Sequence, residues 1–368
     1  MKGNLRVIIA GGGTGGHIFP AVAVGHALQR LRPGTQLLFV GARGKMEMEK
    51  VPQEGFEIIG LDIVGFNRSS IWKNISLPIK LLRSRLQARG IITNFSPHAI
   101  VGVGGYASFP VLNAGQAMNI PTLIQEQNSY AGRSNKILGR RARAVCVAYK
   151  NMEQFFPKER IILTGNPVRK NISDMCGTSE ESKDKFGLRP GVKTILVIGG
   201  SLGAKSINET IDARLDELMK EDVQLIWQTG KPYYEQARNR AMPYSDKVKV
   251  LDFISNMDVA YCAADVVISR AGALAIAELC IAAKPVIFVP YPFAAEDHQT
   301  SNAMALVSHD AALLVKDNDV KTDLIKKLKT LLSDNTMQEV MSTNLKAMAI
   351  RDADERIASK VIEISGVS

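Results

Sequence analysis

The residues that most strongly indicate chemistry lie in a glycine-rich stretch near the N-terminus. Residues 7–28 read VIIAGGGTGGHIFPAVAVGHAL, an apolar run followed by glycines and then His17. Residues 11–16 match the G-x-G-x-x-G spacing of a dinucleotide-binding turn, which raises the hypothesis of a nicotinamide or flavin enzyme. Such an enzyme carries Asp or Glu at the end of its second strand, but LLFVGARG places Gly41 there. The turn therefore predicts a backbone site for another anion, with His17 at the carboxyl edge of a sheet.

A second glycine-rich turn, GGSLGA, follows the apolar run TILVI and contains Ser201. The spelling G-x-S-x-G, with Asp265 and His298 later in the chain, matches the order of a serine hydrolase triad, and this is an alternative enzyme class. A hydrolase has no need of another glycine-rich half at its N-terminus. The favoured interpretation makes Ser201 a helix-start hydroxyl and backbone donor for a phosphate.

Further polar residues follow other apolar runs of the C-terminal half. In ADVVISRAGALAIAELC, Glu278 falls about a turn into a helix. Its carboxylate could accept hydrogen bonds from the vicinal hydroxyls of a ribose, or could simply stabilise the helix dipole. In PYPFAAEDHQTSNA, the side chains of His298, Gln299 and Asn302 are neutral and polar and suit sugar hydroxyls.

Two loops of the N-terminal half complete the set of candidate residues. GVGGYAS is another glycine turn with Tyr106 at its tip, and IQEQNSYAGRSNK places Glu126 and Asn128 just after a strand. Glu126 is an isolated acid among basic neighbours, so we expect its charged form to be favoured. The sequence contains no evident metal-ligand cluster, because the D-x-D pair Asp352 and Asp354 is interpreted as a solvated helix face.

These turns require elements that bring them to one edge of a sheet. Apolar runs of four to six residues alternate with helix-length stretches, which is typical of βαβ units and parallel sheets. The pattern restarts near residue 194, so the sequence predicts two doubly wound halves in tandem. We expect domains over 1–165 and 166–340, with a hinge at 163–172, and a helical tail over 341–368 that could pack back on the first domain. The predicted strands are LRVIIA, QLLFVG, AIVGVG and PTLIQE in the first half, and TILVIG, QLIWQTG, VKVLDFI, ADVVIS and PVIFVP in the second.

Composition limits the classes of protein. The chain has 368 residues, of which 46% are hydrophobic, enough for a large core. Its longest apolar runs fall far short of the roughly 20 residues that cross a bilayer, and the N-terminus does not resemble a signal peptide. Its 4 cysteines are scattered without metal-ligand spacing. These features predict a cytosolic protein with reduced thiols.

The net charge of +10 is concentrated in one region. Between Ile63 and Met152 a single carboxylate faces twelve Lys and Arg residues, which favours an anionic membrane or nucleic acid as a partner. The basic helices lack interleaved aromatic residues, which argues against nucleic acid. Residues 72–89 have apolar side chains at helical spacing, and the regular helix is expected to begin near Leu77. This stripe either packs on the first sheet or docks on a membrane. Its apolar members are Trp72, Ile75, Ile79, Leu82 and Leu86, and its basic neighbours are Lys80, Arg83, Arg85 and Arg89.

Taken together, the motifs resemble those of the MurG family. They fall in order over residues 10–302 and read GGGTGGHIFP, GVGGYAS, QEQN, GNPVR, GGSLGA, SRAGALAIAE and DHQTSNA. The resemblance implies an α/β GT-B fold, in which two Rossmann-like doubly wound domains face each other across a cleft. It also implies a peripheral protein at the cytoplasmic face of the bacterial inner membrane. The implied reaction transfers N-acetylglucosamine, with inversion, from UDP-N-acetylglucosamine to the 4-hydroxyl of undecaprenyl-diphosphate-linked N-acetylmuramyl-pentapeptide, the step from lipid I to lipid II in peptidoglycan synthesis. Another UDP-sugar transferase of this fold is an alternative.

The resemblance also implies roles for individual residues. Ile254 would pair with uracil through its backbone, and Glu278 would bind the ribose. Many relatives have Thr or Ser where this chain has Ala275, and some have two glutamines in place of His298 and Gln299, so the side chain that contacts the sugar there stays open. The implied donor-site residues are Thr14, Gly15, Gly16, Asn128, Arg169, Ser201, Ile254, Ala273, Leu274, Ala275, Ile276, Ala277, Glu278, His298 and Gln299.

An inverting displacement needs a base for the acceptor hydroxyl and positive potential for the departing diphosphate. The catalytic candidates are His17, Glu126 and Tyr106, and either His17 or Glu126 is the base. Arg169 and the helix start at Ser201 would hold the leaving group without a structural metal. No cofactor is required on this view, although a divalent cation could stimulate the reaction. The expected partners are the two substrates and anionic inner-leaflet lipid, and not nucleic acid.

Overall fold

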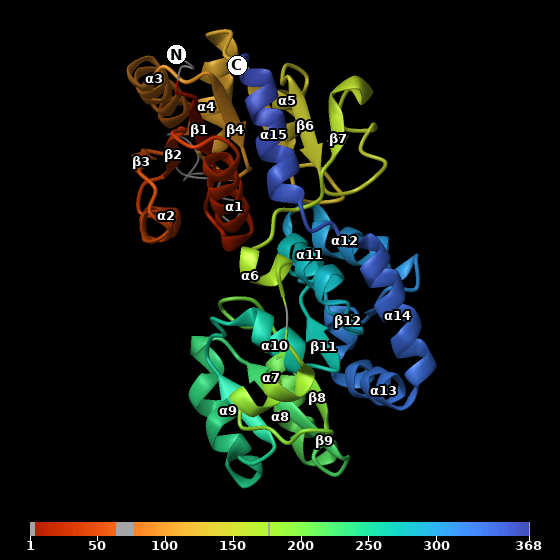
Figure 1. The fold of residues 1–368 in the computed structure, drawn as a ribbon. Helices are drawn as coiled ribbons and strands as arrows, with labels where there is room; N and C mark the ends of the chain where they lie inside the picture. Colours follow the sequence, from red (N-terminus) through yellow and green to blue (C-terminus); the bar gives the residue numbers. More distant parts are fainter. Residues whose placement is uncertain (1–3, 64–76, 176, 368) are drawn as a thin grey trace. The chain divides into compact units, whose positions relative to one another are not determined.

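The computed structural model describes residues 4–63, 77–175 and 177–367 (Figure 1). Of residues 77–81 and 295 only the backbone is described. The chain divides into two units. Unit 1 comprises residues 1–169 together with 352–368, and unit 2 comprises residues 170–351.

Unit 1 contains a parallel sheet of seven strands in the order β3-β2-β1-β4-β5-β6-β7. Pairing of Val7 in β1 with both Leu37 and Ala99 shows that the chain winds outward from the centre in two directions. The carboxyl ends of all seven strands therefore lie at one edge. The strands are β1 (Arg6–Ala10), β2 (Gln36–Ala42), β3 (Ile58–Leu61), β4 (Ala99–Gly102), β5 (Thr122–Glu126), β6 (Ala144–Val147) and β7 (Ile161–Leu163).

Helices cover both faces of this sheet, as continuous apolar strands require. On one face, β-strand residues pack with α1 and the C-terminal helix; on the other they pack with α3, α4 and α5. The helices of unit 1 are α1 (Gly15–Leu31), α2 (Glu47–Gln53), α3 (Leu77–Phe95), α4 (Ser108–Ala117), α5 (Arg133–Gly139) and α15 (Ala353–Ser365).

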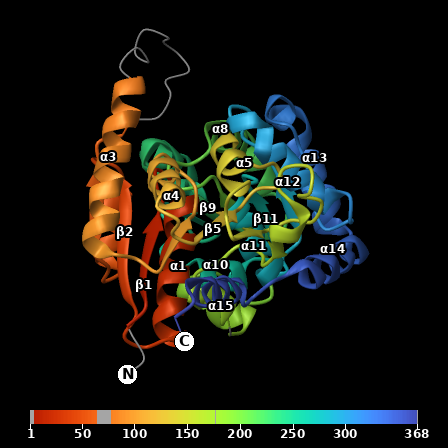
Figure 2. The ribbon, with the colours of Figure 1, turned by 90° about the horizontal axis from the view of Figure 1, so that it is seen from above.

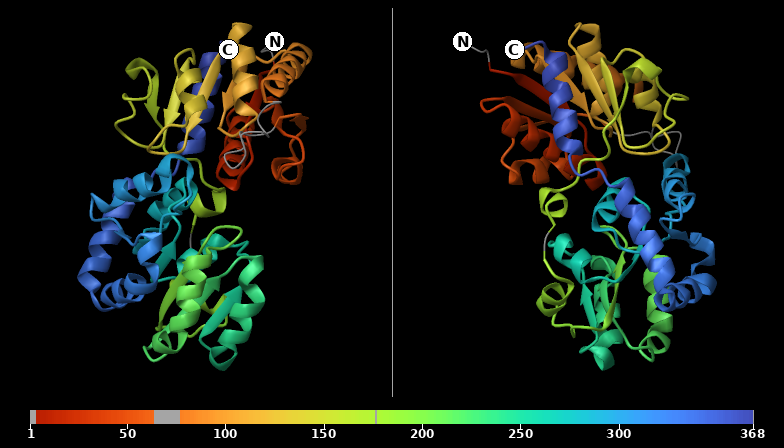
Figure 3. Two further views of the ribbon diagram at one scale, coloured as in Figure 1. Left: turned by 180° about the vertical axis from the view of Figure 1, so that it is seen from behind. Right: turned by 45° about the vertical axis from the view of Figure 1, so that its right-hand side comes forward.

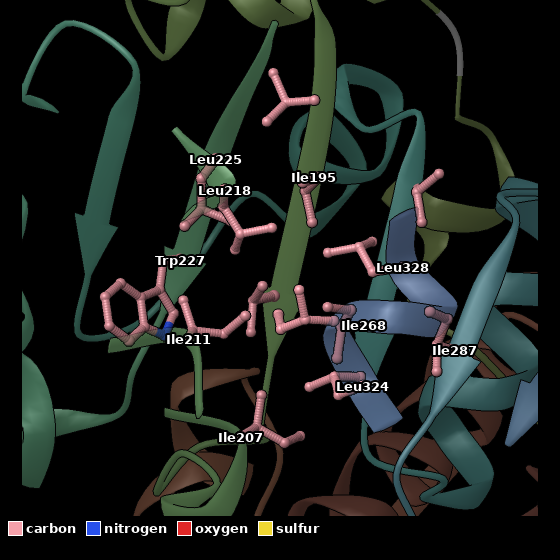
Figure 4. Packing of buried hydrophobic residues seen from close by; sticks show 14 of the residues in the cluster. Ile195, Ile207, Ile211, Leu218, Leu225, Trp227, Ile268, Ile287, Leu324 and Leu328 are labelled. Atoms are coloured by element: carbon pink, nitrogen blue, oxygen red, sulfur yellow. The ribbon is translucent and has the colours of Figure 1, made fainter. Parts of the chain in front are cut away.

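Unit 2 repeats the plan with a six-stranded parallel sheet in the order β10-β9-β8-β11-β12-β13. Its core gathers β-branched and leucine side chains, with Trp227 at one side of the cluster (Figure 4). The indole nitrogen of Trp227 donates to Asn208 at 3.0 Å. The strands are β8 (Lys193–Ile198), β9 (Val223–Gln228), β10 (Val248–Leu251), β11 (Val266–Ser269), β12 (Val286–Phe288) and β13 (Leu313–Leu314). The helices are α6 (Lys170–Ser173), α7 (Ser179–Lys185), α8 (Lys205–Leu218), α9 (Tyr234–Ala241), α10 (Met257–Ala263), α11 (Ala273–Ala282), α12 (His298–Val307), α13 (Val320–Ser333) and α14 (Asn335–Met348).

The boundaries differ from the sequence-based expectation at the C-terminal tail. The tail is helical, but it breaks at residues 349–352 into two helices that belong to different units. α14 packs on α11 and α13 of unit 2, whereas α15 packs on α1 and ion-pairs Asp354 with Arg30 at 2.8 Å (Figure 3). The other boundary, between Arg169 and Lys170, falls inside the predicted hinge and not at residue 165.

α3 begins at Leu77, as predicted, and packs beside α4 (Figure 2). Its buried face contains Ser84, Ala88 and Ile92, whereas Leu82 and Leu86 are 60% and 59% exposed. These two leucines therefore do not pack on the sheet. Arg83, Arg85 and Arg89 are exposed as well. Trp72 and Ile75 lie outside the described residues, as do the side chains of Ile79 and Lys80.

Candidate active site

The first glycine turn connects β1 to α1 at the carboxyl edge of the unit 1 sheet. The N–H of Gly12 donates to the Gly104 carbonyl at 3.3 Å, and the N–H of Gly13 donates to Oε2 of Glu47 at 2.8 Å. Thr14 is the N-cap residue of α1. The amides that follow it open the helix and precede its first internal hydrogen bonds, so they can bind an anion.

His17 lies in the first turn of α1 and is half-buried. Its Nδ1 is 3.2 Å from Oγ1 of Thr14, which orients the imidazole. The other edge of the ring lies against Gly104, where an added Cβ would stand 2.9 Å from Nε2 of His17 and 3.7 Å from Oε1 of Gln127. The structure thus brings His17 together with the loops that follow β4 and β5.

Tyr106 is 48% exposed at the tip of the turn after β4. Gly105 packs on the first glycine turn so tightly that a Cβ there would stand 2.1 Å from the carbonyl oxygen of Gly12. A Cβ on Gly13 would lie 4.0 Å from the Tyr106 ring. The two turns therefore form one surface that includes Tyr106.

Glu126, the last residue of β5, is 2% exposed, and both of its carboxylate oxygens are occupied. Oε1 accepts from the backbone N–H of Asn128 at 3.1 Å and from its side-chain amide at 3.3 Å. Oε2 accepts from the N–H of Gly132 at 3.1 Å and from Nδ2 of Asn135 at 2.9 Å. A carboxylate has about four lone-pair directions, so these donors fill them.

The expectation that basic neighbours would favour the charged form of Glu126 is wrong. Burial raises the pKa of Glu126, because removing a carboxylate from water penalises its charged form, and the hydrogen bonds from Asn135, Asn128 and Gly132 offset this only in part. The sequence showed which charges lie near Glu126 along the chain, but it did not show that the side chain of Glu126 is buried.

A network of buried amides joins this loop to the end of unit 1. Nε2 of Gln125 donates to Oδ1 of Asn166, and Nδ2 of Asn166 donates to the carbonyl of Gln127, both at 2.9 Å. Nε2 of Gln127 donates to the carbonyl of Val103 at 2.7 Å. Arg169 lies three residues after Asn166 in the chain, and its guanidinium is 5.5 Å from the ring of Phe19 in α1. These amides stand in the motifs QEQN and GNPVR, but no role for them was predicted from the sequence.

The second glycine turn differs from the predicted helix start. α8 begins at Lys205 with Ala204 as N-cap, so Ser201 lies three residues before the cap and is exposed in the turn. The N–H of Gly203 donates to the Gly200 carbonyl at 2.9 Å, a bond within the turn. Ser201 therefore presents its hydroxyl from a loop rather than capping the helix.

The hydrolase alternative fails on topology. β8 and β11 are parallel, Ser201 follows the carboxyl end of β8, and Asp265 precedes the amino end of β11. The two residues are separated by the length of a four-residue strand, about 13 Å at roughly 3.3 Å per residue. Asp265 is engaged elsewhere, accepting from Nζ of Lys183 at 2.8 Å and from the N–H of Thr194 at 2.7 Å.

Glu278 lies in the second turn of α11 and is 4% exposed. The hydroxyl of the buried Tyr261 in α10 donates to its Oε2 at 3.1 Å, which fixes the carboxylate. At the preceding end of the helix, Ala273, Leu274 and Ala275 are half-buried, as is Ala277 one turn later, while Ile276 is buried. Tyr261 was not found from the sequence.

Two side chains tie the loops of unit 2 together at the carboxyl edge of its sheet. Nε2 of Gln228, at the end of β9, donates to the carbonyls of Gly200 at 2.9 Å and Asp252 at 3.3 Å, so it joins the second glycine turn to the loop of the buried Ile254. The second of these side chains is that of Arg270, just after β11.

Arg270 follows β11 directly and reaches three other segments. Its guanidinium donates to Oδ1 of Asp317 at 2.6 Å, to Oγ of Ser206 at 3.1 Å and to the carbonyl of Val289 at 3.0 Å. Arg270 therefore connects the start of α8 with the loop before α12. The motif SRAGAL could have indicated this role, because it places an arginine directly after a predicted strand, next to the loops at that edge of the sheet.

His298 and Gln299 are the first two residues of α12, and both are half-buried. Oε1 of Gln299 accepts from the N–H of Tyr291 at 2.9 Å. Asn302 is fully buried. Among the residues that the structure describes, no group of three or more His, Cys, Asp or Glu side chains could hold a metal ion.

Comparison with known proteins shows which family the chain resembles. The glycosyltransferase family 28 N-terminal domain matches residues 7–147, and the C-terminal domain of the same family matches residues 194–357. The chain belongs to glycosyltransferase family 28. Within that family it is 50% identical over 368 residues, 99% of both chains, to the UDP-N-acetylglucosamine–N-acetylmuramyl-(pentapeptide) pyrophosphoryl-undecaprenol N-acetylglucosamine transferase of Bacteroides thetaiotaomicron.

Other proteins with similar sequence or structure point to the same family. The transferase of the same name from Cytophaga hutchinsonii is 50% identical, covering 98% of this chain and 96% of the relative. The crystal structure of Acinetobacter baumannii MurG superposes with a TM-score of 0.79 at 30% identity and covers 98% of this chain and 99% of that one. The predicted MurG-family resemblance and two-sheet GT-B fold class are therefore confirmed. Among the helices of the described residues, none is long and apolar enough to cross a bilayer.

Proposed function

We propose that this protein transfers N-acetylglucosamine from UDP-N-acetylglucosamine to the 4-hydroxyl of undecaprenyl-diphosphate-linked N-acetylmuramyl-pentapeptide, the step from lipid I to lipid II in peptidoglycan synthesis. The observation that carries this proposal is an identity of 50% over 99% of both chains with a transferase of that name. The residue roles proposed for it combine those that the family resemblance implies with the local geometry of each unit.

His17 is the base in this proposal. The acceptor hydroxyl oxygen forms a bond to C1 of N-acetylglucosamine, the bond from C1 to UDP breaks, and UDP leaves with the electron pair. The hydroxyl proton goes to His17, which Thr14 orients through the 3.2 Å contact at Nδ1. Tyr106 stands exposed beside the same turn and would contact the acceptor sugar.

Glu126 serves this reaction as a positioning residue. A raised pKa suits a base, but geometry comes first, and four donors already surround this buried carboxylate. Its hydrogen bonds hold the loop that carries Asn128. Asn128 is then fixed for contact with substrate.

The donor nucleotide belongs, in this proposal, to the carboxyl edge of the unit 2 sheet. Glu278, oriented by Tyr261, binds the ribose hydroxyls, and the backbone at Ile254 binds uracil. The turn that carries Ser201 binds the diphosphate through its hydroxyl and backbone amides. Arg169 supplies positive charge for the leaving group. Stimulation by a divalent cation stays a prediction.

The exposed side of α3 is proposed as the membrane-docking surface. Leu82 and Leu86 present apolar side chains among Arg83, Arg85 and Arg89. A lipid-anchored acceptor has to be reached at a membrane surface, where each cation contributes about 1 kcal/mol against anionic lipid. This placement is at the cytoplasmic face of the inner membrane, as a peripheral protein.

The activity is tested by offering the purified protein a lipid-linked muramyl-pentapeptide with UDP-N-acetylglucosamine, UDP-glucose or UDP-N-acetylgalactosamine. We expect transfer with a clear preference for UDP-N-acetylglucosamine, and calorimetric binding of UDP but not of NAD. Equal use of the three sugars would indicate another UDP-sugar transferase of this family.

The docking surface is tested by vesicle co-sedimentation at low and high salt. Changing Lys80, Arg83, Arg85 and Arg89 to Gln should abolish the salt-sensitive preference for anionic vesicles. The matched control removes the same charge from exposed positions of unit 2, namely Lys185, Lys220, Lys231 and Lys321. If the control loses as much binding as the α3 variant, net charge alone explains the attraction and α3 is not the docking surface.

A further inference from the structure

The first glycine turn already holds an anion of its own. In a dinucleotide-binding turn of this spacing, the backbone amides approach a pyrophosphate. Here the N–H of Gly13 donates at 2.8 Å to Oε2 of Glu47, a side chain from α2. A carboxylate of the chain thus occupies a place where that kind of turn would accept a phosphate.

Glu47 is built into this place. Its side chain is 1% exposed, and its second oxygen, Oε1, accepts from the N–H of Ala42 at 2.9 Å. Within the described residues no lysine, arginine or histidine forms an ion pair with Glu47. Two backbone amides therefore provide the hydrogen bonds of this buried carboxylate, which would be costly to remove from water without partners.

Two glycines make room for it. An added Cβ on Gly12 would stand 2.3 Å from Cδ of Glu47, and one on Gly41 would stand 2.5 Å from its Cγ. Gly41 lies near the end of β2, where dinucleotide enzymes carry their ribose-binding acid. In this chain the absence of a side chain there admits Glu47 to the turn.

We propose that Glu47 is a positioning residue that fills the phosphate place of the first glycine turn and fixes the turn. It excludes a nucleotide diphosphate from Gly13 and holds the start of α1, with Thr14 and His17, in the geometry that the reaction uses. The kinetic part of this inference rests on the proposed function; the structural part, that Glu47 fixes the turn, does not.

The test compares Glu47→Ala and Glu47→Gln with Glu49→Ala, which removes an exposed carboxylate from the same helix. Hydrogen exchange is followed by mass spectrometry in peptides covering residues 11–17, 41–46 and 199–204. In both Glu47 variants we expect faster exchange in the first two peptides, which contain the Gly13 and Ala42 amides, and no change in the third. Gln is the milder change, because its oxygen can still accept from one amide while its NH2 group faces the other.

Kinetics provide the second measurement. Because a displacement of about 1 Å in a reacting group can cost up to about 10²-fold in rate, Glu47→Ala should lower kcat at least about 10-fold. The calorimetric Kd for UDP should stay within about twofold of wild type, since the proposed nucleotide site is in unit 2. Glu49→Ala should match wild type in every measurement.

Each outcome decides a separate point. Unchanged exchange at residues 11–17 in Glu47→Gln overturns the fixing of the turn, whether or not the protein is an active transferase. Faster exchange with unchanged kcat overturns the positioning of His17. If Glu47→Ala fails to fold, the Gln variant carries both decisions. If wild type transfers no sugar while the exchange result is as expected, the proposed function fails and the structural role of Glu47 stands.

Discussion

The two glycine-rich turns have similar sequences and lie at equivalent edges of two similar sheets, yet they differ in what fills them. In the first, the Gly13 amide is bound by the buried Glu47, and α1 begins immediately, at Gly15. In the second, the N–H of Gly203 donates to the Gly200 carbonyl within the turn, and Ser201 is exposed. There α8 begins later, at Lys205. Similar glycine patterns therefore give one closed turn that positions side chains and one open turn suited to a phosphate.

The difference suggests a division of labour between the edges of the two sheets. The edge of unit 1 carries an imidazole, a phenol and a buried carboxylate that holds a loop. The edge of unit 2 carries an open turn and a carboxylate suited to a ribose. We therefore expect variants of the first edge to change the chemical step and variants of the second to change nucleotide binding.

The largest effect is expected from His17→Ala. If His17 takes the proton in the transition state, kcat should fall by about 10² or more. UDP affinity measured by calorimetry should not change, because the proposed nucleotide site lies in unit 2. A variant with near wild-type kcat would remove chemistry from the first edge and break the comparison.

Glu278→Ala should have the next largest effect. Loss of hydrogen bonds from the ribose hydroxyls to a charged group should raise the KM for UDP-N-acetylglucosamine about 10-fold or more, with a smaller change in kcat. Tyr261→Phe serves as the matched variant, because it removes only the hydroxyl that orients Glu278 and should have a weaker effect in the same direction. Unaltered donor kinetics in Glu278→Ala would leave this residue as a helix-dipole carboxylate.

Ser201→Ala sharpens the contrast between the turns. The hydroxyl is one donor among several proposed for the diphosphate, so its loss should raise the Kd for UDP about 3- to 10-fold and leave substantial turnover. A fluorophosphonate probe should not label Ser201. Covalent labelling at that position would contradict both the topological argument against a hydrolase and the role of the open turn.

The smallest effect concerns the pH dependence of stability at Glu126. The pKa of Glu126 is raised above its ordinary value of 4.5, so the native state holds this proton more tightly than the unfolded state. The contribution of Glu126 is then fully present below pH 4.5 and is lost as pH rises through the raised pKa. Glu126→Gln removes this titration.

The measurement is the Tm of Glu126→Gln minus that of wild type, which should become more positive as pH rises from about 4 to neutrality. Glu153→Gln, at an exposed position, should show no such trend. A difference that is constant with pH would mean that burial does not raise the pKa of Glu126, and the buried carboxylate of the first edge would need another explanation.

Much of the fold followed from local patterns. The nine apolar runs predicted as strands all form strands, because a strand buried on both faces needs an uninterrupted apolar stretch. β3, β6, β7 and β13 were not predicted. Of these, β3, β7 and β13 are edge strands whose residues are mostly only partly buried, so they do not need the apolar run of a central strand. The break in the tail at residues 349–352 was likewise missed, because both helices that flank it have the amphipathic pattern of a continuous helix.

The candidate site was only partly readable. Positions at or just after the ends of predicted strands, such as Glu126 and Ser201, could be found because parallel strands end at a common edge, whereas Arg169 was implied only by the family resemblance. Partners contributed by other elements could not. Glu47 and Tyr261 look like ordinary helix residues, and only packing brings them to the turn and the carboxylate that they contact.

The sequence by itself therefore determined the two doubly wound halves, the glycine turns and the family, since these depend on the order and spacing of residues along the chain. Tertiary structure decided which groups are buried and what each one contacts. It turned the expected stabilised charge of Glu126 into a raised pKa, separated Ser201 from Asp265 by the length of a strand, and placed Glu47 in the first turn. Desolvation and hydrogen bonding depend on neighbours in space, and those neighbours lie on segments that the linear spacing does not connect.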